Sequence, residues 1–352
     1  MRLPRRFTPR NDKESHMVFY RTYRPKLISQ LDKTDVRERI GSLLQSKSVP
    51  HAFLFSGPRG TGKTSTARIV AKALNCEHVD KKVTTRVATT IEPCNKCSNC
   101  LAIINGTHMD VIEIDAASNR GIDEIRELRD KIALSPSMGK KKIYIIDEVH
   151  MLTREAFNAL LKTLEEPPVH VTFILATTEP HKLPGTIISR CVQITFSKAT
   201  DQELKRSLNR VIAGEKVEIS DKALSLIVKS ADGSFRDAVK ILEQAVSENR
   251  LSDADISLLI GLTGNIDLIE IVLHRDIKRA LSSIEEQYQN GTDFSLYIQS
   301  LLEGLHEQLL ENPENTEVKK LIKYLMRAYS ETKTTSIPQL PLELAVIEYC
   351  SN

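Results

Sequence analysis

The stretch that decides the fold of this chain is Gly57-Pro58-Arg59-Gly60-Thr61-Gly62-Lys63-Thr64. It has the pattern G-x-x-x-x-G-K-[ST], in which glycines let backbone N–H groups close around phosphate oxygens. An apolar run at 51–56 precedes it and predicts a buried strand, and the stretch at 65–74 predicts a helix. We expect Lys63 to contact the β- and γ-phosphates and the Thr64 hydroxyl to ligate Mg²⁺. A chance glycine-rich turn is the alternative, but the motif and both flanks favour a phosphate site.

A second predicted strand, at 143–147, ends in two carboxylates. Asp147 and Glu148 follow the apolar residues directly, and the carboxyl ends of parallel strands are where an α/β sheet presents its chemistry. We expect Asp147 to hold Mg²⁺ and Glu148 to orient and polarise an attacking water. Another apolar run ends in Thr177 and Thr178, either of which can hydrogen-bond that water or the γ-phosphate. The alternatives are an acidic helix N-terminus and a threonine that merely ends a strand.

Four of the six cysteines lie in one part of the chain. These are Cys76, Cys94, Cys97 and Cys100. Four thiolates can form a closed tetrahedral structural zinc site. Disulfides, an iron–sulfur cluster, or His78 in place of Cys76 are the alternatives. We expect Cys191 and Cys350 to be ordinary small buried or half-buried residues.

The segment from 76 to 100 contains neither the phosphate motif nor the acidic pair. Thiolate ligation would give this short, polar segment its fold, so we expect metal removal to unfold it locally. Because neither motif falls inside the segment, metal removal should disturb partner contact or solubility more than nucleotide affinity.

The composition predicts a folded chain of two or three domains. Of 352 residues, 41% are hydrophobic, enough for real cores, and 27% are charged. Residues 1–26 carry a net charge of +6 and the remainder carries −3, so the chain does not resemble a protein that coats DNA. Residues 1–17 are basic and lack apolar periodicity, which predicts a disordered tail. The sequence has no secretory h-region and no run long enough to span a membrane.

Further motifs accompany the phosphate loop, the acidic pair and the threonines in a fixed order. They are Tyr20-Arg21-Thr22-Tyr23-Arg24-Pro25-Lys26, Ser189-Arg190-Cys191 and Gly233-Ser234-Phe235-Arg236-Asp237-Ala238. Together they resemble the AAA+ clamp-loader ATPases, and within them the gamma/tau family of bacterial DNA polymerase III. The resemblance covers residues 18–262 in detail, and the four cysteines have the arrangement of a zinc module in that family. One departure is Ile28-Ser29-Gln30, where the family often has Ile/Val-Gly-Gln.

The resemblance implies roles for individual residues. Thr178, with Thr177 beside it, matches sensor 1, and Arg236 matches the sensor 2 arginine that reaches the γ-phosphate. Arg190 matches the arginine that enters the ATP site of a neighbouring subunit. Its alternative is a surface arginine paired with a carboxylate. Arg24 matches a segment that packs near the adenine.

The resemblance also implies the domain organisation. We expect a RecA-like α/β domain at 18–198, with its zinc module at about 76–100. A helical lid should follow at 199–262, beginning with a capping box at Thr200, and an all-α collar at 263–352. Within the first domain we expect strands near 51–56, 110–114, 143–147, 171–176 and 192–196, and an amphipathic helix at 122–134.

The implied function is that of an ATPase subunit of the bacterial replicative clamp loader, using ATP, Mg²⁺ and Zn²⁺ in the cytoplasm. Its partners would be other loader subunits in a hetero-pentameric ring, the sliding clamp, primer–template DNA and the polymerase III core, with no membrane contact. The chain ends soon after the collar, so we expect the short, gamma-like form, without a polymerase active site. The alternatives are a non-hydrolysing structural subunit of the same loader and another AAA+ DNA machine, such as a branch-migration helicase.

Overall fold

The computed structural model describes residues 18–46, 48–78, 80–85, 88–118, 132–260, 265–289, 292–332 and 335–351. Contacts divide the chain into two compact units. The first comprises residues 1–217 and 228–243, and the second comprises residues 218–227 and 244–352. The expected tail at 1–17 and most of the expected helix at 122–134 lie outside the described residues.

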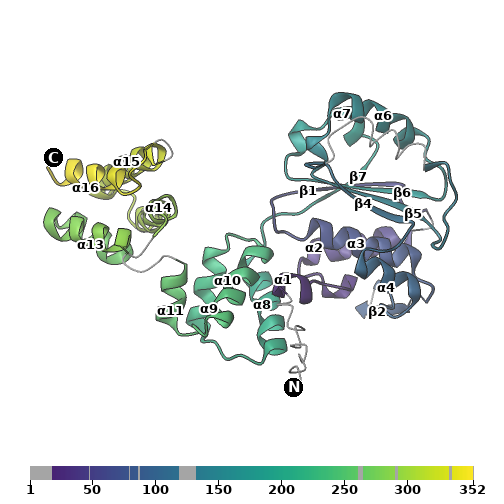
Figure 1. Ribbon diagram of the computed structural model, residues 1–352, viewed down its shortest axis with the longest axis horizontal. Coiled ribbons are helices and arrows are strands. Elements are labelled where there is room, and N and C mark those ends of the chain that lie inside the picture. The colour runs from purple at the N-terminus through teal and green to yellow at the C-terminus, as the bar shows by residue number, and fades with distance from the viewer. Residues whose placement is uncertain are drawn as a thin grey trace, which may run out of the picture. The chain divides into compact units, whose positions relative to one another are not determined.

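A five-stranded parallel sheet forms the centre of the first unit, in the order β4-β5-β6-β1-β7 (Figure 1). The strands are β1 (Ala52–Ser56), β4 (Val111–Asp115), β5 (Lys142–Asp147), β6 (Val171–Thr177) and β7 (Val192–Thr195). All five predicted strands are therefore confirmed. The register pairs Asp115 with Asp147 and Ser56 with Thr177, so the polar carboxyl ends of four strands meet at one edge of the sheet.

Helices cover both faces of the sheet, which explains why its three central strands, β5, β6 and β1, are buried almost throughout. Phe53 and Phe55 point to one face and pack with α2 and α3, while Leu54 points to the other and packs with α6. Figure 1 shows α2 and α3 on one side of the sheet, with α6 and α7 on the other. These helices and the short turns beside them are α1 (Phe19–Thr22), η1 (Ile28–Gln30), α2 (Thr34–Gln45), α3 (Lys63–Asn75), α4 (Ser98–Asn105), η2 (Val149–Met151), α6 (Arg154–Glu165), η3 (Pro180–Lys182) and α7 (Gly185–Ile188).

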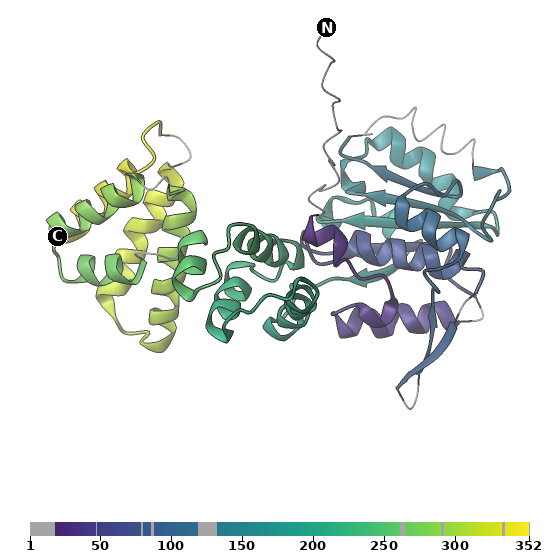
Figure 2. The ribbon, with the colours of Figure 1, turned by 60° about the horizontal axis from the view of Figure 1, so that its bottom comes forward.

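An antiparallel hairpin that the sequence analysis did not predict follows α3. Its strands are β2 (Asp80–Thr85) and β3 (Ala88–Glu92). Figure 2 shows it extending from the rest of the domain, while β3 contacts α2 and η1 at its base. The run of lysines and threonines in β2 has no apolar alternation, so the usual signal of a half-buried strand is missing.

The helices after the sheet begin with α8 (Asp201–Glu215), α9 (Asp221–Ser230) and α10 (Phe235–Ser247). The predicted capping box is confirmed: Thr200 Oγ1 accepts from the Glu203 N–H, and the Glu203 carboxylate accepts from the Thr200 N–H. Such reciprocal bonds satisfy N–H groups that a helix start leaves unpaired.

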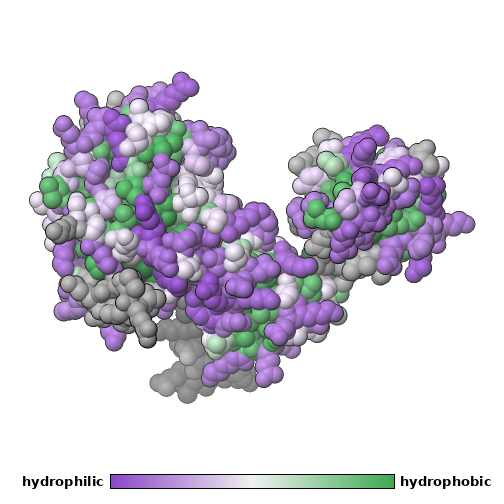
Figure 3. Space-filling view, turned by 180° about the vertical axis from the view of Figure 1, so that it is seen from behind, coloured by the Kyte–Doolittle hydropathy of each residue, from purple (hydrophilic) through white to green (hydrophobic). Residues whose placement is uncertain are grey.

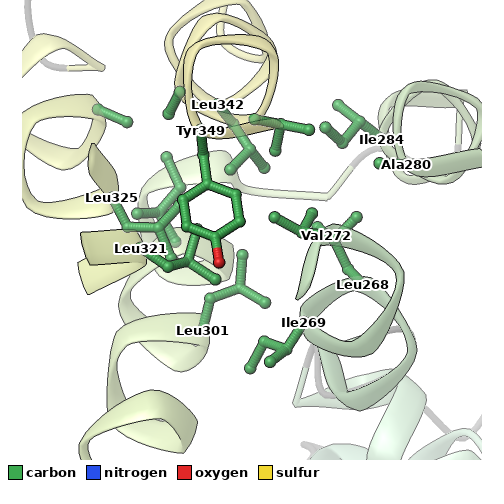
Figure 4. Packing of buried hydrophobic residues seen from close by; sticks show 14 of the residues in the cluster. Leu268, Ile269, Val272, Ala280, Ile284, Leu301, Leu321, Leu325, Leu342 and Tyr349 are labelled. Atoms are coloured by element: carbon green, nitrogen blue, oxygen red, sulfur yellow. The ribbon is translucent and has the colours of Figure 1, made fainter. Parts of the chain in front are cut away.

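In the second unit, the regular elements described after residue 250 are all helices, and one apolar core holds α12 to α16 together. The helices are α11 (Asp253–Leu259), α12 (Asn265–Leu273), α13 (Ile277–Gln289), α14 (Phe294–Glu311), α15 (Thr316–Glu331) and α16 (Leu340–Ser351). Figure 4 shows the Tyr349 ring among leucines of α14, α15 and α16. Leu301 and Leu325 are both buried there.

The face shown in Figure 3 is mostly hydrophilic, with scattered hydrophobic patches. Val169, for example, is 90% exposed, and isolated exposed apolar residues are normal in globular proteins. Among the helices that the structure describes, none is long and apolar enough to cross a membrane.

Candidate nucleotide site and cysteine cluster

The phosphate loop lies between β1 and α3, and two of its glycines are required by close packing. Gly57 has φ 146° and Gly60 has φ 79°, a region that favours glycine. A Cβ atom on Gly57 would lie 2.0 Å from the Phe196 carbonyl oxygen, and one on Gly60 would lie 2.0 Å from Ser234 Oγ. The predicted loop is thus a tightly held turn at the edge of the sheet.

The Lys63 side chain lies across this loop. Its Nζ donates to the carbonyl oxygens of Gly57 and Pro58, at 2.7 and 2.8 Å. Burial lowers the pKa of Lys63, and the nearby Glu148 and Asp147 carboxylates act in the opposite direction. The Lys63 ammonium group is largely buried beside these two carbonyl oxygens. Phosphate oxygens of a bound nucleotide can therefore replace the carbonyl oxygens as its acceptors.

The start of α3 and the end of β5 bring Thr64 and Asp147 together. Thr64 Oγ1 donates to Asp147 Oδ2 at 2.7 Å, across 83 residues of sequence. A hydroxyl and a carboxylate are oxygen ligands of the kind that Mg²⁺ takes. The residues present therefore fit the expected magnesium position.

Glu148 is held by Thr178 and not by Thr177. Glu148 Oε2 accepts from the Thr178 N–H at 3.3 Å and from its hydroxyl at 3.1 Å. The backbone of Glu148 is left-handed, with φ 48° and ψ 44°. The Thr177 hydroxyl instead lies 3.0 Å from His150 Nδ1, so the two threonines have different partners.

His150 connects these groups, although the sequence analysis gave it no role. Its Nε2 lies 3.1 Å from Glu179 Oε2, and its Nδ1 lies 3.5 Å from Glu148 Oε2. The Glu179 N–H donates to Thr177 Oγ1 at 3.0 Å. A histidine directly after two carboxylates was the available signal, but a contact with residues 27 and 29 positions away cannot be read from spacing.

The start of α10 packs on the phosphate loop. The Phe235 N–H donates to the Gly60 carbonyl oxygen at 3.1 Å. The neighbouring Arg236 guanidinium lies 4.9 Å from the centroid of the Tyr20 ring, a cation–π distance. Its buried Nε has no hydrogen-bond partner among the described residues, so Arg236 has an unused donor beside the loop.

One pocket of ≈ 860 Å³ contains most of the predicted nucleotide residues. Arg24 and Arg236 line it together with Lys63, Asp147 and Glu148. Burial lowers the pKa of Arg24. A pocket of this size suits a nucleotide, and it places Arg24 and Arg236 in the same cavity as the phosphate loop.

Arg190 lies outside this pocket. Its guanidinium donates to the Thr186 carbonyl oxygen at 2.7 Å and to Glu165 Oε1 at 2.6 Å. The side chain is 33% exposed. Within one chain, therefore, Arg190 is a surface arginine paired with a carboxylate. Its partly exposed guanidinium is also accessible to a neighbouring subunit.

The four predicted zinc ligands form one cluster. The Sγ atoms of Cys76, Cys94, Cys97 and Cys100 all lie within 4.8 Å of one another, and Cys76 Sγ lies 4.0 Å from Cys97 Sγ. Tetrahedral zinc with Zn–S bonds of about 2.3 Å needs sulfur–sulfur separations of about 3.8 Å. Cys191 and Cys350 lie outside the cluster, half-buried and buried respectively, as expected.

Backbone donors support the cluster. The Cys94 N–H donates to Cys76 Sγ at 3.3 Å, and the Lys96 and Cys97 N–H groups donate to Cys94 Sγ at 3.4 and 3.3 Å. Burial opposes ionisation of Cys94, but these backbone bonds lower its pKa overall, to about 6. Donors aimed at sulfur stabilise the thiolate that a metal requires, so the donor set fits zinc.

Comparisons with known protein families cover most of the chain. Residues 33–200 match a family model described as DNA polymerase III, delta subunit. Residues 203–249 match the DNA polymerase III clamp loader subunit, ATPase lid domain. Residues 251–316 match domain III of DNA polymerase III subunits gamma and tau.

Curated relatives agree with these matches. The chain is 40% identical to DNA polymerase III subunit tau of Bacillus subtilis, over 96% of this chain and 63% of that protein. It is 38% identical to subunit tau of Escherichia coli, over 83% and 45%. Subunit gamma of Buchnera aphidicola subsp. Acyrthosiphon pisum is 30% identical over 96% and 99%. The chain thus spans less than two thirds of the tau proteins, but nearly all of this gamma protein, and it belongs to the gamma/tau family of DNA polymerase III clamp-loader subunits.

Proposed function

We propose that this chain is an ATP-hydrolysing subunit of a bacterial replicative clamp loader, which loads the sliding clamp onto primed DNA. The observation that carries the proposal is the convergence of Lys63, Thr64, Asp147 and Glu148 at one pocket, with Arg236 beside it. A non-hydrolysing structural subunit would not need a carboxylate at Glu148 held by the next strand. Membership of the gamma/tau family supports this reading over another AAA+ machine.

In phosphoryl transfer of this kind, the protein acts mainly by positioning the reactants and stabilising the charge that develops on the phosphate oxygens. The backbone of Gly57–Thr64 would surround the phosphates, and Lys63 would exchange its two carbonyl partners for phosphate oxygens. Glu148 would then orient the attacking water, with Thr178 fixing its carboxylate. Arg236 would turn its unused donor to the γ-phosphate. Arg24 would line the nucleoside end.

Two metals complete the proposal. Thr64 and Asp147 would hold Mg²⁺, which neutralises charge developing on the β- and γ-phosphate oxygens. Cys76, Cys94, Cys97 and Cys100 would hold a structural Zn²⁺.

Arg190 would act on the ATP of a neighbouring subunit. Its support is its position outside its own pocket and its partial exposure. An arginine supplied in trans typically raises hydrolysis by about 10³–10⁵. The rate of ATP hydrolysis would then depend on assembly of the ring, because each such site would need the Arg190 of a neighbouring subunit.

We assign the ATPase domain to 18–198, the lid to 199–262 and the oligomerisation domain to 263–352. The partners would be the other loader subunits of a hetero-pentameric ring, the sliding clamp, primer–template DNA and the polymerase III core, all in the cytoplasm. The family matches at 33–200 and 203–249 support the first two divisions, whereas the domain III match begins at 251, inside the lid as we assign it.

The test is reconstitution of the loader from purified subunits. ATP hydrolysis should rise when clamp and primed DNA are added, and clamps should become linked to circular primed DNA. Lys63→Ala in every copy of this chain should abolish both. A wild-type chain that binds no ATP, or a loader indifferent to this substitution, would contradict the proposal.

A further inference from the structure

The cysteine cluster and the nucleotide pocket are joined by a buried lysine. Lys72 lies on α3, one turn before Cys76, and is 3% exposed. Its Nζ donates to the Lys26 carbonyl oxygen and to Asn95 Oδ1, both at 2.6 Å. Lys26 and Lys72 both line the nucleotide pocket, whereas Asn95 stands between two of the clustered cysteines.

Asn95 makes a second contact with the same carbonyl group. Its Nδ2 donates to the Lys26 carbonyl oxygen at 3.3 Å. Its backbone has φ 55°, a left-handed conformation set by the tight turn from Cys94 to Cys97. The position of this amide therefore depends on how the cysteines are held.

Glu92 extends the connection. It is 1% exposed, and its two carboxylate oxygens accept from the N–H groups of Ile28 and Ser29, at 2.8 and 2.7 Å. A carboxylate at these N–H groups satisfies the start of η1. Leu31, directly after η1, lines the pocket as well. Four hydrogen bonds thus link the segment 26–29 to α3 and the cysteine module.

We propose that the cysteine module positions the nucleoside-side wall of the pocket through Lys72, Asn95 and Glu92, so that metal binding and nucleotide binding are energetically coupled. This rests on the proposed function, because it assumes that the pocket takes ATP. It revises the expectation, drawn from the order of the motifs alone, that metal loss would disturb partner contact or solubility more than nucleotide affinity.

The physical reasoning concerns what happens when the four sulfur atoms separate. The turn at 94–97 then loses its attachment to Cys76 at the end of α3, and Asn95 moves with it. Lys72 is left as a buried cation with one acceptor fewer, which is costly. The segment 26–29, which leads from Lys26 toward Leu31 in the pocket wall, consequently loosens, while the bonds of Lys63 and Thr64 in the phosphate half are unaffected.

The expected signature is a change in affinity without a change in chemistry. The KM for ATP should rise, while kcat at saturating ATP in the assembled loader should stay near the wild-type value. A general loss of folding would lower both the active fraction and kcat. This difference separates a positioning role from a merely structural one.

Asn95 offers a matched pair of variants. Glycine and aspartate both tolerate its left-handed backbone, but only Asn95→Asp keeps the acceptor for Lys72. Asn95→Gly loses both the bond from Lys72 and the bond to the Lys26 carbonyl oxygen, and loss of the charged bond alone should raise the Kd for a fluorescent ATP analogue about 10-fold. Asn95→Asp, which loses only the longer bond to the Lys26 carbonyl oxygen, should raise the Kd by a smaller factor. Lys72→Met, which alters no residue of the module, should raise the Kd by a factor similar to that of Asn95→Gly.

Metal removal tests the coupling itself. Protein purified without added metal should hold one zinc per chain by elemental analysis, and chelation should raise the nucleotide Kd about 10-fold. Because coupling is reciprocal, saturating nucleotide should raise the apparent zinc affinity by the same factor. Lys63→Ala, which should not bind nucleotide, should show no such rise.

Several outcomes would overturn this inference. They are a zinc-free native protein, an unchanged Kd after chelation, or wild-type Kd values for both Asn95→Gly and Lys72→Met. Failure of the proposed function looks different, because the wild-type, zinc-loaded chain would then not bind ATP at all.

Discussion

Thr178→Val should slow ATP turnover by this chain without weakening ATP binding. Valine keeps the shape of threonine but removes the hydroxyl that donates to Glu148 Oε2 at 3.1 Å. The Thr178 N–H, at 3.3 Å, remains. Glu148 therefore keeps one of its two bonds from this residue and loses the better-placed one.

The magnitude follows from the environment of that bond. A hydrogen bond to a charged group contributes about 1.5–3 kcal/mol. The Glu148 side chain is 30% exposed, so water partly replaces the lost donor and the lower end applies. About 1.5 kcal/mol corresponds to a kcat roughly 10-fold lower. The KM should change little, because Lys63 and the loop backbone are untouched.

Thr177→Val is the matched control. Thr177 is 0% exposed, and its hydroxyl contacts His150 and the Glu179 N–H. Its loss leaves buried polar groups unpaired, at about 1–3 kcal/mol, so the main effect should be a lower Tm. Steady-state ATPase assays on both variants measure the effect on kcat, and thermal melts measure the effect on Tm. A normal kcat for Thr178→Val beside a slow Thr177→Val would refute our assignment.

Three other predictions use different parts of the site. Glu148→Gln should bind ATP normally and lose most turnover, about 10²–10⁴-fold, whereas Lys63→Ala should also lose binding in a filter assay; near-normal hydrolysis by Glu148→Gln would remove this residue from the mechanism. Arg190→Ala should bind ATP normally as an isolated subunit but hydrolyse poorly in the ring, and mixing it with Lys63→Ala subunits tests the geometry; weaker ATP binding by the isolated variant would mean that Arg190 acts in cis. Lys33→Met should destabilise the first compact unit by about 1–3 kcal/mol, because the buried Glu203 on α8 loses its cation at 3.5 Å; an unchanged urea midpoint would show that the pair contributes nothing.

Local sequence patterns were sufficient for much of the fold. The three central parallel strands are mainly apolar runs that end in polar residues, and the phosphate loop is defined by eight consecutive positions. The four cysteines were identifiable because metal ligation demands particular atoms. In each case, the residues that make the pattern recognisable are those whose type is restricted by burial, by phosphate binding or by metal ligation.

Contacts between distant residues were not predictable in this way. The choice of Thr178 over Thr177 as the partner of Glu148 depends on the twist and end of β6, which neighbouring threonines do not reveal. The link from Asn95 to Lys26 spans 69 residues and is made by ordinary polar side chains. The β2–β3 hairpin was not predicted because most of its strand residues are polar. Its two strands also pair with each other and not with the main sheet.

The left-handed backbone of Glu148 has an evolutionary consequence. A non-glycine residue in that conformation costs about 1–2 kcal/mol relative to the ordinary helical region, and glycine or asparagine would adopt it more easily. Thermodynamic stability and catalysis therefore favour different amino acids at this position. In a lineage whose ring no longer needed this chain to hydrolyse ATP, random substitution should drift toward glycine or asparagine here. Glutamate should persist only while turnover is under selection.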